Sequence, residues 1–173
     1  MKQPVLKPQD IMVCVELAQK FERPPKFADL AQTLGISVSE AHASCKRAER
    51  SRLLYRAPDG FHVNVAGLAE FLTSGIKYAF PIVEGPITRG IPTGGAAPVF
   101  ADKFIGAEEL PTVWQDAEAP FRGRSIVPLY PTIPTIAKTN YRLYEMFAVI
   151  DALRGGNARI REEATLQLWR LLR

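Results

Sequence analysis

The chain has 173 residues, enough for one well-buried core or for a small domain with a second part of similar size. Hydrophobic residues make up 47% and charged residues 23%, as in most folded globular chains, so extensive disorder is excluded. The net charge of +4 is compatible with a polyanionic partner, although many proteins with a small basic excess bind none.

The first predicted helix starts near Pro8, because proline is favoured where a helical N–H would have no partner anyway. Pro24 and Pro25 are expected to end it. Its predicted buried face consists of apolar residues at helical spacing, namely Ile11, Cys14 or Val15, Ala18 and Phe21. A short second helix follows, which Gly35 ends, with an apolar side made of Phe27, Leu30, Ala31 and Leu34.

The third helix has the firmest predicted boundary, because Ser37 and Glu40 form a capping box that satisfies two free backbone donors. Its inward face is predicted to be made of small residues, namely Val38, Ala41, Cys45 and Ala48. Residues 53–63 read as a strand, a tight turn at 57–60 and a second strand. Asn64 is placed to cap a fourth helix that carries Val65, Leu68, Phe71 and Leu72 and ends near Gly75.

The stretch FADLAQTLGIS at 27–37, with KRAER at 46–50 and the pair Leu53–Leu54, resembles the winged helix-turn-helix of MarR-like bacterial transcriptional regulators. The resemblance covers residues 8–75. It implies that the third helix is a recognition helix and that the hairpin is a wing. The chain departs from the family pattern at Arg52, where glycine is usual, and at Cys45, where leucine is usual.

Basic residues gather on this predicted recognition helix and wing. Between His42 and Arg56 there are five basic residues and one acidic residue, Glu49. The predicted DNA-binding residues are Ser37, Ser39, His42, Ala43, Lys46, Arg47, Arg50 and Arg56. Those near the helix N-terminus are expected to meet base edges, and Lys46, Arg47 and Arg50 to meet phosphates. The alternative is a solvated basic face on a winged helix that binds protein.

We expect no enzymatic activity, cofactor or metal site. Cys45 is predicted to face inward on the helix whose outer face carries His42, so no nucleophile lies beside a base. The two histidines, His42 and His62, lack an acidic cluster nearby. The sequence TGGA at 93–96 lacks the spacing of a phosphate-binding loop. Two cysteines at core positions and no apolar run of membrane or signal length predict a cytoplasmic protein outside the membrane.

Residues 76–139 hold nine prolines and six glycines and lack helical periodicity. Their many apolar side chains would be costly to leave in water, so we expect this segment to be ordered. Two roles stay open, namely extended segments that complete a helical core, and a pocket or partner-binding surface. The candidate residues for the second role are Arg89, Trp114 and Tyr130.

The last part, residues 140–173, reads as two helices that begin at Asn140 and Asn157 and are separated by Gly155–Gly156. Such a hairpin serves either as a homodimer interface or as part of the core. The predicted fold is therefore mainly α, with a winged helix at 1–75, an irregular Pro-rich segment at 76–139 and a helical hairpin at 140–173.

The predicted function is sequence-specific binding of double-stranded DNA by a homodimeric regulator that represses or tunes transcription. The alternative is an antitoxin-like interaction protein that holds a protein partner through its C-terminal half and represses its own operon.

Overall fold

A computed structural model describes residues 5–19, 21–104 and 110–173. The chain is mixed α/β, with 55% helix and 17% strand, and is not mainly α as predicted. It divides into two compact units, the first formed by Met1–Glu70 with Leu172 and the second by Phe71–Leu171 with Arg173. Residues 1–4, 20 and 105–109, which belong to segments with predicted structure, lie outside the described residues.

The first helix of unit 1, α1 (Pro8–Leu17), begins where it was predicted. The Asp10 carboxylate accepts a hydrogen bond from the Lys7 N–H at 2.9 Å and so caps the helix start. The predicted end was wrong, because Gln19 closes the last turn through its N–H to the Glu16 carbonyl and its side chain to the Val15 carbonyl. Phe21 therefore lies beyond the helix and is 45% exposed.

The next two helices, α2 (Phe27–Leu34) and α3 (Val38–Arg50), are joined by a three-residue turn. Gly35 ends α2 in the left-handed conformation, with φ of 64°, and Ser37 caps α3 by accepting the Glu40 N–H at 3.1 Å. The predicted inward residues Ala41, Cys45 and Ala48 are buried. Val38 is exposed, contrary to prediction, because the buried stripe is centred on the side of α3 that carries Ser44.

The predicted hairpin is present as β1 (Leu54–Ala57) and β2 (Gly60–Val63), with Ala57 paired to Gly60 across a two-residue turn. Asn64 caps the next helix, α4 (Val65–Glu70), by accepting the Gly67 N–H at 3.1 Å. Gly75 does not end this helical stretch, since a π-helical turn (Phe71–Gly75) leads directly into α5 (Ile76–Ala79).

The Pro-rich segment is not irregular, because it forms a small closed sheet in unit 2 from β3 (Glu84–Pro92), β4 (Thr112–Gln115) and β5 (Phe121–Ile126). β3 pairs antiparallel with both other strands, and β4 pairs parallel with β5. A Cβ on Gly90 would lie 2.2 Å from the Trp114 carbonyl oxygen, and one on Gly123 would lie 2.0 Å from the Pro111 oxygen. Glycines in this segment suggested a loop. They instead allow these strands to approach one another closely.

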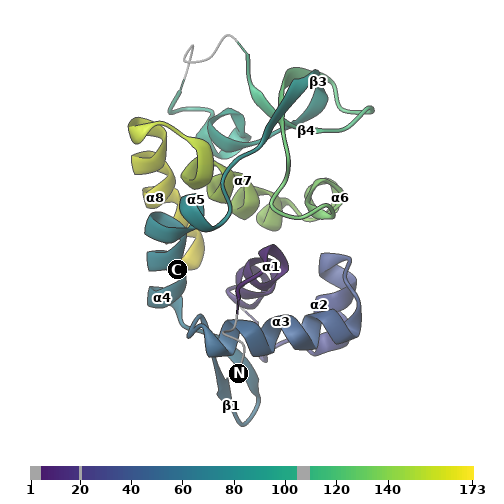
Figure 1. Ribbon diagram of the computed structural model, residues 1–173, viewed down its shortest axis with the longest axis vertical. Coiled ribbons are helices and arrows are strands. Elements are labelled where there is room, and N and C mark those ends of the chain that lie inside the picture. Colours follow the sequence, from purple (N-terminus) through teal and green to yellow (C-terminus); the bar gives the residue numbers. More distant parts are fainter. Residues whose placement is uncertain (1–4, 20, 105–109) are drawn as a thin grey trace. The chain divides into compact units, whose positions relative to one another are not determined.

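Three helices complete unit 2, namely α6 (Ile133–Thr139), α7 (Tyr141–Gly155) and α8 (Ala158–Leu172). Asn140 caps α7 and Asn157 caps α8, as predicted. In Figure 1, β3 and β4 lie over α7, and the Tyr144 hydroxyl donates to the Pro92 carbonyl at 2.7 Å. Because α7 is buried along most of its length, it forms the core of this unit.

Candidate nucleic-acid interface

The outer side of α3 is a stripe of four residues at helical spacing: Ser39, Ala43, Lys46 and Arg50. It lies opposite the buried stripe that contains Ala41 and Cys45. Ser39 and Arg50 are exposed, and Ala43 and Lys46 are half-buried. Lys46 forms an ion pair of 3.5 Å with Glu49, whereas Arg50 has no ionic partner among the described residues. We call these four residues the α3 stripe. They are the part of the predicted site that faces outward.

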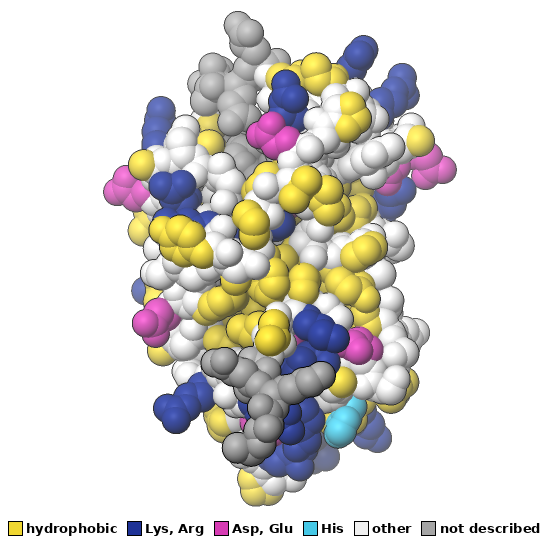
Figure 2. All heavy atoms as spheres, in the orientation of Figure 1, with side chains coloured by type: hydrophobic (Ala, Val, Ile, Leu, Met, Phe, Trp, Pro, Cys, Tyr) yellow, Lys and Arg dark blue, Asp and Glu magenta, His cyan; other side chains and the backbone are white. Residues whose placement is uncertain are grey.

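The hairpin contributes a second cation to the same region. The Arg56 guanidinium lies 4.7 Å from the centre of the Phe61 ring, and the Lys46 ammonium lies 5.9 Å from it. The fold thus brings Lys46 and Arg56 together over one aromatic ring, although they are ten positions apart in the sequence. Figure 2 shows Lys and Arg side chains gathered around α3 and the β1 hairpin.

His42 lies at the edge of the α3 stripe and contacts the Phe27 ring edge-on, with ring centres 5.0 Å apart. Phe27 also packs near Phe61, at 6.1 Å, so one aromatic pair supports residues from α2, α3 and the hairpin. Phe27 and Phe61 were not among the predicted site residues. Their aromatic type was visible, but their proximity depends on how the hairpin folds back.

Arg47 does not lie with the outward basic residues. Only 17% of its side chain is exposed, and its guanidinium donates to the Asp10 carboxylate on α1 at distances from 2.6 to 3.0 Å. It also donates to Glu40 at 2.5 Å and to the Ser44 hydroxyl at 3.0 Å. Arg47 is therefore an internal residue that holds α3 against α1.

The predicted capping box forms only in part. The Ser37 hydroxyl accepts the Glu40 N–H and contacts the Ser39 hydroxyl at 3.0 Å. The Glu40 carboxylate is engaged by Arg47 and by the Gln9 amide, the latter at 3.0 Å. Burial alone would raise the pKa of Glu40, but the hydrogen bonds from Arg47 and Gln9 and the nearby positive charge lower it below its ordinary value.

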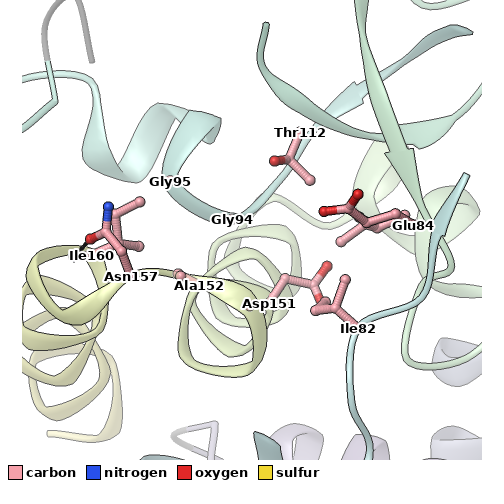
Figure 3. Close-up of a pocket in the computed structure, with 12 residues that line it drawn as sticks. Ile82, Glu84, Gly94, Gly95, Thr112, Asp151, Ala152, Asn157 and Ile160 are labelled. Atoms are coloured by element: carbon pink, nitrogen blue, oxygen red, sulfur yellow. Dashed lines mark hydrogen bonds between the residues drawn. The ribbon is translucent and has the colours of Figure 1, made fainter. Parts of the chain in front are cut away.

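Unit 2 holds a pocket of about 270 Å³ between the sheet and the ends of α7 and α8. The side chains of Glu84 and Thr112 approach it from the strands, and Asp151 and Asn157 from the helices (Figure 3). Its glycines lie in two pairs, Gly94–Gly95 and Gly155–Gly156. The segment thus contacts α7 through Pro92 and also lines a pocket, and both predicted roles stay predictions.

Asp151 is a structural group at the wall of this pocket rather than a free one. Its carboxylate accepts hydrogen bonds from Thr93 at 2.9 Å, from the Trp114 indole at 2.7 Å and from Arg154 at 2.6 Å. Trp114, a predicted candidate for a pocket or a partner-binding surface, is fully buried. Tyr130 is half-buried, and only Arg89 of the three candidates is exposed.

Both cysteines, Cys14 and Cys45, are free and buried. Burial raises the pKa of Cys45 to about 12, so its reactive thiolate form is scarce at neutral pH. The described ranges contain no group of three or more His, Cys, Asp or Glu side chains that could hold a metal ion. They also contain no helix with the length and apolar character needed to cross a bilayer.

Comparison of the chain with protein-family models, curated proteins and solved structures finds no match.

Proposed function

We propose that unit 1 is a winged helix that binds double-stranded DNA sequence-specifically, and that the protein regulates transcription. The observation that carries the proposal is the α3 stripe, whose Lys46 gathers with Arg56 of the hairpin over Phe61. The order of three helices and a hairpin, with the tight turn at Gly35, fits the winged helix-turn-helix that the sequence resembles.

The proposed contacts differ along α3. Ser39, His42 and Ala43 lie in its N-terminal half and would meet base edges in the major groove. Lys46, Arg50 and Arg56 would pair with phosphates, which strengthen binding to any sequence. Arg47 is left out of this set because its guanidinium is already bound to Asp10 and Glu40. Ser37 would contribute mainly by capping α3.

The test begins with selection of a preferred duplex from a random library with the full chain. Binding is then measured across about 50 to 200 mM salt on the selected duplex and on a random one. Arg50→Ala should reduce the slope of log affinity against log salt by about 0.9 for each bound protomer, on both duplexes. His42→Ala should leave that slope unchanged and alter the selected sequence. Arg142→Ala, at an exposed arginine of unit 2, is the matched control.

Two results would contradict the proposal. One is an equal affinity of the parent protein for selected and random duplexes. The other is a parent-like salt slope for both Arg50→Ala and a Lys46→Ala variant. Either result would favour the alternative in which the winged helix is a protein-binding module.

We also propose that the protein forms a homodimer through α8. Leu166 and Trp169 are three residues apart on this helix and are 61% and 40% exposed. Phe147, on the other helix of the predicted hairpin, is buried in the unit 2 core.

Light scattering at tens of micromolar should give a dimer for the parent and a monomer for the pair Leu166→Ser and Trp169→Ser. A monomeric parent that co-purifies with another protein at a one-to-one ratio would instead support the antitoxin-like alternative.

A further inference from the structure

Three arginines lie on one face of the sheet in unit 2. Arg89 on β3 is the direct cross-strand partner of Arg122 on β5, and Arg124 is the partner of Ile87. All three arginines are exposed, while the alternate β5 residues Gly123 and Ser125 are buried. We call Arg89, Arg122 and Arg124 the arginine face.

This arrangement is unfavourable for the isolated sheet. Like charges at directly opposite positions of an antiparallel pair repel one another. None of the three guanidinium groups has an ion pair with a carboxylate among the described residues. Elsewhere in the same unit, Arg154 is paired with Asp151, and Lys138 is paired with Asp116 and Glu118. The arginine face is therefore a concentration of uncompensated positive charge.

The three groups lie close enough together to contact neighbouring phosphates. Arg122 and Arg124 are two positions apart on one strand, which separates their Cα atoms by about 6.6 Å. Arg89 lies beside Arg122 at the cross-strand distance of about 5 Å. Guanidinium groups bind phosphate through two parallel hydrogen bonds, so three of them can hold adjacent phosphates of one backbone.

We propose that the arginine face binds the phosphate backbone of duplex DNA, as a second contact separate from α3. An acidic protein partner is less suited to this face, because protein interfaces bury an apolar centre and the apolar cross-strand partner that β3 offers these arginines is Ile87, opposite Arg124. The choice of DNA as the polyanion rests on the proposed function of unit 1. The phosphate contact itself depends only on the three arginines.

The test uses the full chain and a labelled random-sequence duplex. A triple variant, Arg89→Gln, Arg122→Gln and Arg124→Gln, is compared with a control of equal charge change at three exposed arginines on the helices of the same unit: Arg142→Gln, Arg159→Gln and Arg170→Gln. Loss of three phosphate contacts should reduce the slope of log affinity against log salt by about 2.7 for each bound protomer, and the control should keep a slope close to that of the parent.

A further variant separates charge from folding. Replacing the same three arginines by lysine keeps the charge and should preserve most of the slope, and the glutamine variant should melt no lower than the parent because a repulsion is removed. The inference is overturned if the glutamine variant has the parent's slope, or if the control loses as much slope. Loss of binding through Lys46→Ala and Arg50→Ala together, with the arginine-face variant unchanged, would overturn this inference and leave the proposed function of unit 1 intact. The reverse pattern would support the arginine face and overturn the role of α3.

Discussion

Arg47 on α3 donates hydrogen bonds to both carboxylate oxygens of Asp10 on α1, at distances from 2.6 to 3.0 Å. Asp10 is fully buried and also caps α1 through the Lys7 N–H. The same carboxylate therefore fixes the start of one helix and the position of the other. Arg47 acts as a positioning residue for the proposed DNA-binding face.

Arg47→Ala should lower the free energy of unfolding by about 2–4 kcal/mol, because it leaves the buried Asp10 carboxylate without its charged partner. Arg50→Ala is the matched control, since it removes the same side chain from an exposed position three residues on and should change stability by less than about 0.5 kcal/mol. Urea unfolding of the full chain measures both. Equal effects of the two variants would show that Arg47 has no special structural role.

Acid should weaken the contact between Glu40 and Arg47. The pKa of Glu40 is lowered in the folded state, so its contribution to stability is present above its ordinary value near 4.5 and is lost as pH falls through the lower folded value. Urea midpoints measured from about pH 6 to pH 3 should fall less steeply for Glu40→Gln than for the parent. Glu22→Gln, at an exposed acid of unit 1, should follow the parent, and a parallel decline in all three proteins would refute the prediction.

Arg52 has a left-handed backbone, with φ of 61°, at the position where the resembled family usually has glycine. Its carbonyl accepts a hydrogen bond from the Asn64 side chain at 2.9 Å, which glycine would preserve. Arg52→Gly should raise the free energy of unfolding by about 0.5–1 kcal/mol, because glycine adopts this conformation without a Cβ penalty. Arg52→Ala removes the charge and keeps the strain, so it should not raise the melting temperature. An increase in stability of similar size in both variants would show that removal of the Arg52 charge, and not relief of backbone strain, causes the effect.

Asp151 should be the most sensitive acid in unit 2. Asp151→Ala would leave Arg154 buried without its charged partner and would also remove the acceptor of Thr93 and Trp114, at a cost of about 3–5 kcal/mol. Glu162→Ala, at an exposed acid on α8, should change stability by less than about 0.5 kcal/mol. Thermal melting followed by tryptophan fluorescence compares the two, and a small loss for Asp151→Ala would exclude a central role for this network.

Residues whose side chains cap a nearby backbone N–H determined where several helices begin. Ser37, Asn64, Asn140 and Asn157 each cap the helix predicted to follow them, because a side-chain acceptor reaches a backbone N–H only three residues away. The turn at Gly35 and the pairing of the hairpin were also predictable from local sequence, because glycine readily adopts the left-handed conformation and a two-residue turn fixes the hairpin register. These features depend on neighbours in the chain and not on distant contacts.

Only the tertiary structure decided the features that depend on distant residues. Arg47 looks like its neighbour Lys46 in the sequence, and it turns inward because Asp10, 37 positions earlier, lies buried beside it. The sheet of unit 2 was missed because its strands carry glycine and proline in place of a regular alternation, and Gly90 and Gly123 matter only through close approaches to another strand. The pairing of Arg89 with Arg122 likewise exists only once β3 and β5 are in register, since a one-residue shift would turn either side chain to the other face.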